Sequence, residues 1–345
     1  MIAVLILSLA QQVSVPCPQG AREPQLSVGA DGHVALGWGT AEALYCCYGE
    51  PGSESFHIVH RVAHDLRFAI GMRRGPRVAI FEGDHVVMTA IGGEEGGGKD
   101  GDLYAWRNMP KVSGWREPVR INSVPGSARE GLQALSRSEH EKIYCAWIDL
   151  RSGKPQIYGA LSEDRGQTWT DESLVSKEAE ICPCCAPSVA FDTTGRVYVM
   201  WRGVHNGSRD MQIASPGGEA TKLGSGTWKL DACPMDGGAL APAADGGMLT
   251  VWRREKQVFS ARVGASETLI GAGEQPWIGG STIVWLEKRG GKLFALASGA
   301  KEPAVLDSSA NDPVIAAQPH GKGALYAAWE TGEGDATQIR LQRLP

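Results

Sequence analysis

The sequence lacks any excess of basic residues. Its 34 Lys and Arg stand against 39 Asp and Glu, which gives a formal net charge of −5 at pH 7. A protein that neutralises a nucleic-acid backbone needs a basic surface. This balance therefore argues against nucleic acid as a partner.

The chain also lacks an apolar run of the about 20 residues that a membrane-spanning helix needs. Its longest apolar stretch, Met1–Ala10, ends in Ser8-Leu9-Ala10, which is similar to the small-residue cleavage site of a signal peptide. We expect no membrane span, a signal peptide over residues 1–10, and export to the periplasm or the extracellular space. The alternative is that Met1–Leu9 forms a buried strand.

Helical periodicity of useful length is missing as well, whereas glycine is abundant, with 45 Gly and 19 Pro in 345 residues. Glycine suits tight turns and works against long helices. In place of helices the chain shows a repeat. A short apolar run ends in a tryptophan six times, and the tryptophans are Trp38, Trp147, Trp201, Trp252, Trp285 and Trp329.

Each of these runs is typical of a strand buried on both faces, and further apolar stretches flank it. Asp84–Ala90 is a copy without the tryptophan, and the mean step of about 48 residues matches one four-stranded propeller blade. We predict an all-β fold, a closed β-propeller of seven blades, over residues 11–345 as a single domain. Six blades is the alternative, because the step from Trp252 to Trp285 is short. Gln12-Val13-Ser14-Val15 would supply the missing fourth strand of the last blade and close the ring.

The third repeat contains Ser162-Glu163-Asp164-Arg165-Gly166-Gln167-Thr168-Trp169. This segment resembles the Asp box, S-x-D-x-G-x-T-W, of sialidases and related propellers, and at the level of repeats the resemblance covers Pro24 to Pro345. It implies a turn in which Asp164 bonds turn amides, Gly166 takes a positive φ and Trp169 packs between blades. It is specific for fold rather than function, because the architecture serves enzymes, binders and assembly factors.

In propellers of this kind, the loops that lead into the innermost strands share one face with the loops between second and third strands, around the channel mouth. Arginines gather in these loops, and paired hydrogen bonds from arginine recognise carboxylate or phosphate. We therefore expect an acidic saccharide or a similar small anion to bind there. The alternative is that the arginines pair with acids and rigidify the loops. The candidate ligand-binding residues are Arg74, Arg77, Arg129, Arg202 and Arg209.

The sialidase resemblance also implies a glycoside hydrolase similar to exo-α-sialidase. The carboxylates best placed for acid/base work on a glycosidic bond are Glu130, Asp149, Asp210 and Asp236, each with a structural role as the alternative. The chain departs from the family, because no Arg-Ile-Pro segment occurs near the start and no tyrosine nucleophile can be assigned. Two non-enzymatic hypotheses stand beside this one: a propeller with a metal or disulfide site, and a propeller that binds a protein partner.

Eight cysteines provide a second signal. Cys182, Cys184, Cys185 and Cys233 fall in the loops that lead into two consecutive blades, and Cys17 also precedes an innermost strand. We expect these five to converge at the channel mouth, either as disulfides in an oxidising compartment or as a thiolate site for Cu or Zn, with Met235 and His205 as further ligands. Redox chemistry and free buried thiols are the remaining alternatives. The side chains of Cys46 and Cys47 should point to opposite faces of a strand, and Cys145 should pack in the core.

Overall fold

The computed structural model describes residues 11–345 except 41, 57–58, 63–64, 83–84, 109–113, 178–179 and 320–322. The described chain is built almost entirely from β-strands. It also contains the short 3₁₀ turn η3 (Gly334–Ala336). The expected signal peptide, residues 1–10, lies outside the described residues. Within the described part, no helix has the length and apolar character needed to cross a membrane.

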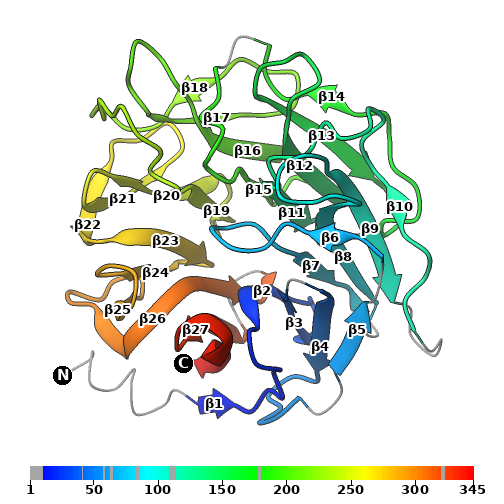
Figure 1. The fold of residues 1–345 in the computed structure, drawn as a ribbon. Helices are drawn as coiled ribbons and strands as arrows, with labels where there is room; N and C mark the ends of the chain where they lie inside the picture. Colours follow the sequence, from blue (N-terminus) through cyan, green and yellow to red (C-terminus); the bar gives the residue numbers. More distant parts are fainter. Residues whose placement is uncertain are drawn as a thin grey trace.

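Antiparallel sheets are arranged radially around a common centre (Figure 1). The first sheet contains β2 (Arg22–Val28), β3 (Val34–Gly39), β4 (Leu44–Gly49) and β5 (Val59–Val62). The second contains β7 (Arg77–Ile80), β8 (Val86–Gly93), β9 (Asp102–Asn108) and β10 (Val119–Arg120), with β6 (Arg67–Phe68) also paired to β8. The third contains β11 (Gln133–Arg137), β12 (Ile143–Asp149), β13 (Gln156–Ser162) and β14 (Ser173–Leu174).

Two further sheets have the same four-stranded form. The first of them contains β15 (Ser188–Phe191), β16 (Val197–Arg202), β17 (Met211–Ala214) and β18 (Thr221–Lys222). The other contains β19 (Gly238–Pro242), β20 (Met248–Arg254), β21 (Gln257–Arg262) and β22 (Thr268–Ala272). A seven-stranded sheet contains β23 (Glu274–Gly279), β24 (Thr282–Leu286), β25 (Gly291–Leu296), β26 (Ala304–Ala317), β27 (Leu325–Thr331), β28 (Gln338–Leu344) and β1 (Gln11–Val13).

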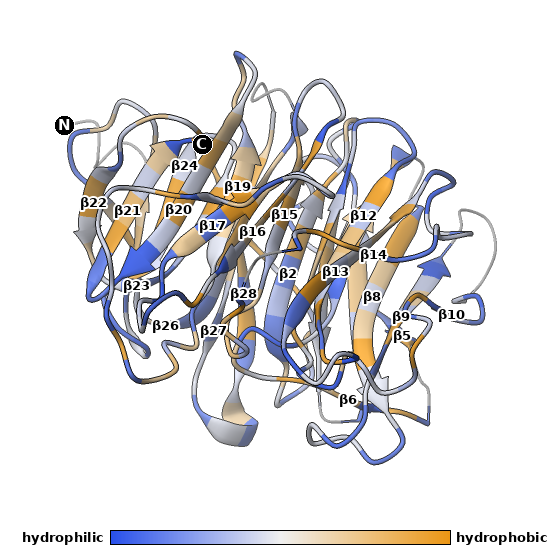
Figure 2. Cartoon of the chain, turned by 90° about the horizontal axis from the view of Figure 1, so that it is seen from above, coloured by the Kyte–Doolittle hydropathy of each residue, from blue (hydrophilic) through white to orange (hydrophobic). Residues whose placement is uncertain are grey.

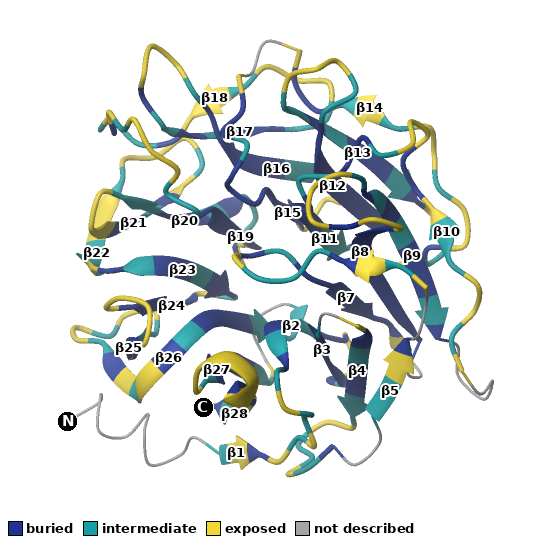
Figure 3. Cartoon of the chain, viewed as in Figure 1, coloured by how far each residue is buried: buried dark blue, intermediate teal, exposed yellow. Residues whose placement is uncertain are grey.

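The innermost strands surround the centre. Contacts run from β2 through β7, β11, β15, β19, β23 and β26, and β26 contacts β2. These strands line a central cavity of about 740 Å³. Apolar side chains from each strand face it, and they include Leu26, Val78, Ala134, Val189, Ala239, Ile278 and Ile315. The inner strands are largely buried, whereas the outer strands β14, β18 and β22 are exposed (Figure 3).

The tryptophan repeat corresponds to the second strand of each four-stranded unit. All six repeat tryptophans lie on such strands, from Trp38 on β3 to Trp329 on β27, and all are at most 2% exposed. Figure 2 shows apolar strands flanked by polar loops at both ends. The short step from Trp252 to Trp285 has a simple cause, because Gly273 alone joins β22 to β23. Its φ of +148° and its close approach to the Leu286 carbonyl leave no room for a side chain.

The first and last described strands pair with each other. Gln11 lies opposite Arg343 and Val13 opposite Leu341 in the β1–β28 pair. The N-terminal segment therefore supplies the strand that the repeat pattern lacks at its end, as expected, although Ser14 and Val15 lie beyond β1.

The turn after β13 is held by one carboxylate. Asp164 Oδ1 accepts hydrogen bonds from the amides of Gln167 and Thr168 at 2.9 and 2.8 Å, and Thr168 Oγ1 donates to Asp164 Oδ2. Gly166 takes a φ of +79°. Trp169 packs against a cluster that includes Val87 of β8 and Ile143 of β12, so it bridges two sheets. All three expectations for this turn are confirmed.

Candidate functional site

A loop of the second sheet lies over the centre of one face. Residues 71–75 precede β7 and extend across the ring (Figure 1). The Arg73 guanidinium lies 5.0 Å from the centroid of the Trp277 ring on β23. Met72 and Arg73 have φ values of +55° and +66°, a conformation that costs a bulky residue free energy and is common at functional sites. This face is therefore capped by a strained, polar loop.

Beneath this face lies a group of buried carboxylates, Glu23, Asp312 and Glu330, here called the acid cluster. Their oxygens lie within 4.8 Å of one another, and each residue is at most 5% exposed. The Arg289 guanidinium donates to Asp312 at 2.9 Å, and the Glu23 amide donates to Glu330 Oε1 at 2.7 Å. The acid cluster joins β2 to β26 and β27, two strands near the other end of the described chain.

The acid cluster arises from a repeated distortion of the inner strands. Glu23, Gln275 and Asp312 have φ values of +56°, +50° and +45°, and each lies within an irregularity of strand pairing. A bulge of this kind re-aims a side chain. The Gln275 amide donates to Asp236 Oδ2, and the Asp312 amide donates to Gln275 Oε1. Side chains thus tie neighbouring inner strands together around the mouth.

Sequence reasoning missed the acid cluster. A signal was present, because Glu23, Gln275 and Asp312 each stand immediately before a proline at the start of an innermost strand. Proline supplies no amide to the ladder, so it occupies bulges and strand starts. A polar residue before such a proline is therefore a marker for a side chain at the mouth.

Burial dominates the electrostatics of the acid cluster. Burial, followed by the charge of Asp312, raises the pKa of Glu330 to about 7. Burial also raises the pKa of Glu23 well above its usual value, an effect to which Asp312 and Glu330 add and which Arg77 and Arg73 oppose. The acid cluster therefore holds protons near neutral pH that isolated carboxyl groups would have lost.

We predict that Glu330→Gln makes stability less dependent on pH. The folded chain holds the Glu330 proton more tightly than the unfolded chain, so the free energy of unfolding should fall as pH rises from about 4.5 to about 7. The side-chain amide of the variant does not titrate, and its Oε1 can still accept from the Glu23 amide. Urea unfolding at pH 5 and pH 8 should show a fall smaller by on the order of 2 kcal/mol in the variant. The exposed Glu333→Gln should match the parent, and equal falls in all three proteins would contradict the prediction.

Asp149, one of the four acids expected from the sequence, is fully engaged in structure. It is 0% exposed and accepts five hydrogen bonds, three of them from Arg151 and one each from Ser127 and Trp147. Although burial opposes it, these bonds lower the pKa of Asp149 below its usual value. Arg151 also pairs with Glu172 at 2.8 Å. The carboxylate therefore organises the loop after β12.

The other three expected acids lie apart. Asp210 Oδ1 accepts from the Trp228 amide at 2.9 Å, and Lys222 lies 3.2 Å from Oδ2. The backbone carbonyl of Glu130 accepts from Arg74 Nε at 2.7 Å. Burial raises the pKa of Asp236, whose Oδ1 has no hydrogen-bond partner among the described residues. In the described part of the chain, no hydrogen bond or ion pair joins any two of the four expected acids.

The expected arginines mainly bind backbone carbonyls. Arg202 is buried and donates to the carbonyls of Asp236, Arg209 and Arg253. Arg77 donates to carbonyls of its own loop, including Arg73 at 2.7 Å. Arg209 donates to the Leu230 carbonyl, and Arg129 is half-buried with its backbone beside Gly101. These contacts match the loop-rigidifying alternative, with carbonyls in place of the expected acids.

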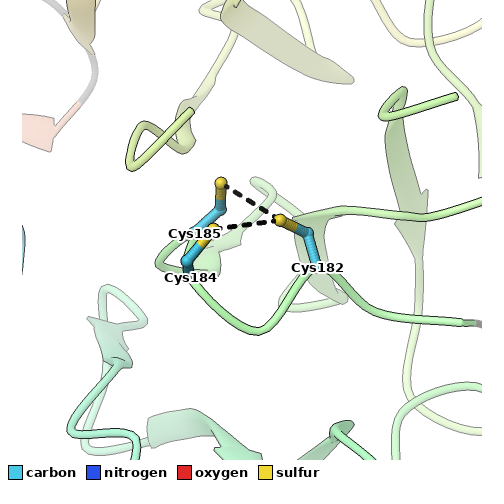
Figure 4. Close-up of side chains that lie close together, drawn as sticks. All are labelled: Cys182, Cys184 and Cys185. Carbon is cyan, nitrogen blue, oxygen red and sulfur yellow. Dashed lines mark hydrogen bonds between the residues drawn. The ribbon is translucent and has the colours of Figure 1, made fainter. Parts of the chain in front are cut away.

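Three cysteines converge in the loop before β15. The Sγ of Cys182 lies 3.3 Å from that of Cys184 and 3.6 Å from that of Cys185, and all three lie within 4.8 Å of one another. Figure 4 shows the Cys184 and Cys185 side chains together, facing Cys182. Met235 and Val204 pack against this three-cysteine cluster. The structure therefore brings together three of the five cysteines that were expected to converge.

The three-cysteine cluster shifts the pKa values of its own members. Hydrogen-bond contacts with Cys184 and Cys185 lower the pKa of Cys182 far below the usual thiol value, and the Arg209 guanidinium, 3.1 Å from its Sγ, adds to this. The pKa values of Cys184 and Cys185 are raised, chiefly by their contacts with Cys182. A thiolate is the form of cysteine that binds metals.

All eight cysteines are free, and the nearest sulfurs of the three-cysteine cluster are well beyond the about 2.05 Å of a disulfide. Cys233 is exposed and interacts with Cys184, as expected for neighbouring loops. The expectation for Cys17 is wrong, because it packs with a different cluster that includes Val13 and Leu341. Its segment follows β1 at the edge of the seven-stranded sheet rather than facing the mouth. Cys46 and Cys47 enter different core clusters and Cys145 is buried, as expected.

Comparison with known proteins shows the fold and no closer relationship. No known family matches the sequence, and no curated protein does. Among solved structures, the α-L-arabinofuranosidase Arb93A of Fusarium graminearum has a TM-score of 0.58 at 9% identity, with 96% of this chain and 97% of that chain covered. The α-L-arabinanase of Penicillium chrysogenum gives 0.55 at 12% identity, with 96% and 97% covered. YCF48, solved bound to a D1 peptide, gives 0.55 at 12% identity, with 97% of each chain covered. The chain is therefore a β-propeller, and glycoside hydrolases are among the proteins that share its fold.

Proposed function

We propose that this propeller binds a soft metal ion, Cu(I) in preference to Zn(II), through Cys182, Cys184 and Cys185. The observation that carries the proposal is the spacing of their sulfurs, at 3.3 and 3.6 Å from Cys182. Sulfurs bound at about 2.3 Å to one tetrahedral ion lie about 3.8 Å apart. The measured spacing is therefore close to that of a shared ion.

The ligand set favours Cu(I). Structural zinc sites almost always have four ligands of nitrogen, sulfur or oxygen. Here three thiols converge, and the side chain packed against them is the thioether of Met235. Thiolate and thioether sulfur are ligands that select Cu(I), and three of them suffice for it. The guanidinium of Arg209 offsets part of the negative charge of the bound thiolates.

Anaerobic titration of the reduced protein with Cu(I), against a chromophoric Cu(I) chelator, tests this proposal. We expect one tightly held Cu(I) per chain, with an ultraviolet thiolate-to-copper charge-transfer band that grows in parallel. A molar excess of Zn(II) should not displace it. A chain that fails to compete with the chelator, or that binds Zn(II) more tightly than Cu(I), would refute the assignment.

We further propose that the ring has seven blades and belongs with the sialidase-like Asp-box propellers. Two blades would share β26, whose first part pairs with β25 and whose last part pairs with β27. The turn bonds of Asp164 support the Asp-box assignment. Export is part of the same proposal and rests on Met1–Ala10. An experimental structure with six inner strands would contradict the blade count.

A second candidate function is hydrolysis of a glycoside at the acid cluster, because Glu330, with a pKa raised to about 7 by burial, suits a general acid. The general acid would then belong to the acid cluster (Glu23, Asp312 and Glu330) rather than to the four acids expected from the sequence. The arginines of the mouth face would then meet an acidic saccharide or another small anion. Fluorogenic sialosides and arabinosides test it. Turnover should be lost in Glu330→Gln, and turnover retained in that variant would exclude the acid cluster.

A further inference from the structure

We propose that Cys233 is the residue through which Cu(I) passes between a soluble thiolate carrier and the three-cysteine cluster. This inference rests on the proposed metal-binding function and adds a partner class to it, a carrier that presents Cu(I) on exposed thiolates. Cys233 would act during exchange, whereas Cys182, Cys184 and Cys185 would hold the ion at rest.

The four sulfurs form a series from the interior to the solvent. Cys182 and Cys185 are at most 1% exposed, Cys184 is 8% exposed, and Cys233 is exposed at the surface. Cys233 stands two residues before Met235, whose side chain packs against the cluster, and Cys184 is the outermost member of the cluster. A carrier thiolate has no direct access to Cys182, so an ion bound there must first meet an accessible sulfur.

The loop that carries Cys233 is fixed at both ends. Before it, the Leu230 carbonyl accepts from Arg209 Nε at 3.2 Å, and the same guanidinium donates to Cys182 Sγ at 3.1 Å. After it, the Asp236 carbonyl accepts two hydrogen bonds from the buried Arg202. Arg209 and Arg202 therefore hold the Cys233 loop beside the three-cysteine cluster.

Met235 gives the loop a second soft ligand. Its φ of +53° is a strained conformation for a methionine, and its side chain packs against the three-cysteine cluster. Strain of this kind persists where the surrounding structure imposes it. The loop thus presents a thiol and a thioether in succession beside the buried thiols.

The exchange involves no change of oxidation state. Cys233 loses its thiol proton, and its sulfur forms a bond to Cu(I) while the carrier thiolate is still bound. The bond between Cu(I) and the carrier sulfur then breaks, and the released carrier thiolate takes up a proton. Cu(I) next bonds to Cys184, which gives up its thiol proton, and Cys233 takes up a proton as its sulfur leaves the ion.

Stopped-flow transfer from Cu(I)–glutathione to the full reduced chain tests this role. Cys233→Ser should slow uptake at least about tenfold, because the accessible thiolate is gone. Its final stoichiometry should stay at one Cu(I), and its affinity in a chelator competition should stay within about threefold of the parent. Cys17→Ser, which changes a cysteine of a different cluster, should match the parent in both measurements.

The outcomes separate this inference from the function on which it rests. Uptake by Cys233→Ser at the parental rate would overturn the transfer role while metal binding stands. A loss of affinity in Cys233→Ser equal to that in Cys182→Ser would also overturn it, because Cys233 would then be a permanent ligand. A parent chain that binds no Cu(I) would refute the proposed function itself and the inference with it.

Discussion

Replacement of Cys182 by serine should lower the affinity of the chain for Cu(I) at least about 100-fold, which is about 2.7 kcal/mol of binding free energy. Cys182 is the one sulfur close to both others, at 3.3 and 3.6 Å. Serine replaces this shared soft ligand with a hydroxyl, which Cu(I) binds poorly. Equilibrium competition with a Cu(I) chelator gives the ratio of affinities.

The variant should fold normally, because the serine oxygen can still accept a hydrogen bond from Arg209. Equal circular dichroism spectra and unfolding midpoints would establish this. Cys17→Ser provides the matched control, since it makes the same chemical change away from the cluster. If Cys182→Ser and Cys17→Ser bind Cu(I) equally well, the metal does not bind at the three-cysteine cluster.

Asp149→Ala should lower the free energy of unfolding by about 4 kcal/mol, because it removes the buried partner of an ion pair together with all of its hydrogen bonds. The change removes all five hydrogen bonds to the carboxylate. Arg151 would retain Glu172, but the indole of Trp147 and the hydroxyl of Ser127 would be left unpaired inside the protein. Urea unfolding followed by tryptophan fluorescence measures the loss.

Asp210→Ala is the matched comparison, because Asp210 also lies near the connection between the second and third strands of its sheet but is only half-buried. It should cost about 1 kcal/mol, since it loses one amide bond and one partly exposed ion pair. A fully stable Asp149→Ala protein would show that this carboxylate does not organise the loop. If Asp149→Ala instead loses glycosidase turnover without losing stability, the result would indicate that Asp149 acts in catalysis.

Much of the fold follows from local pattern. The tryptophan repeat identifies the second strand of each unit because burial on both faces demands an apolar run, and turns before it fix its start. The role of Asp164 in its turn can be predicted because its hydrogen-bond partners lie within four residues of it in the sequence. The convergence of Cys182, Cys184 and Cys185 follows in the same way from one short loop.

The features that sequence reasoning missed depend on long-range geometry. Glu23 and Glu330 meet because β2 lies beside β27. No pattern in the sequence around either strand indicates that the two strands are neighbours. The arginines were expected to bind a ligand, but Arg202 donates its hydrogen bonds to backbone carbonyls. The amino-acid composition does not indicate which acceptor an arginine will bind. Cys17 shares the sequence context of the other cysteines but belongs to another part of the ring.

The pairing of β1 with β28 has a consequence for how the chain is made. The two strands come from opposite ends of the described chain, so their contact has the largest sequence separation in the fold. During synthesis, residues 11–13 emerge long before β28, so this pair can form only after the last described strand has been made. Contacts of such long range slow folding, and the unpaired edge of β28 is open to other strands until β1 docks. Docking of β1 is therefore a step at which a nascent chain is exposed to misassembly.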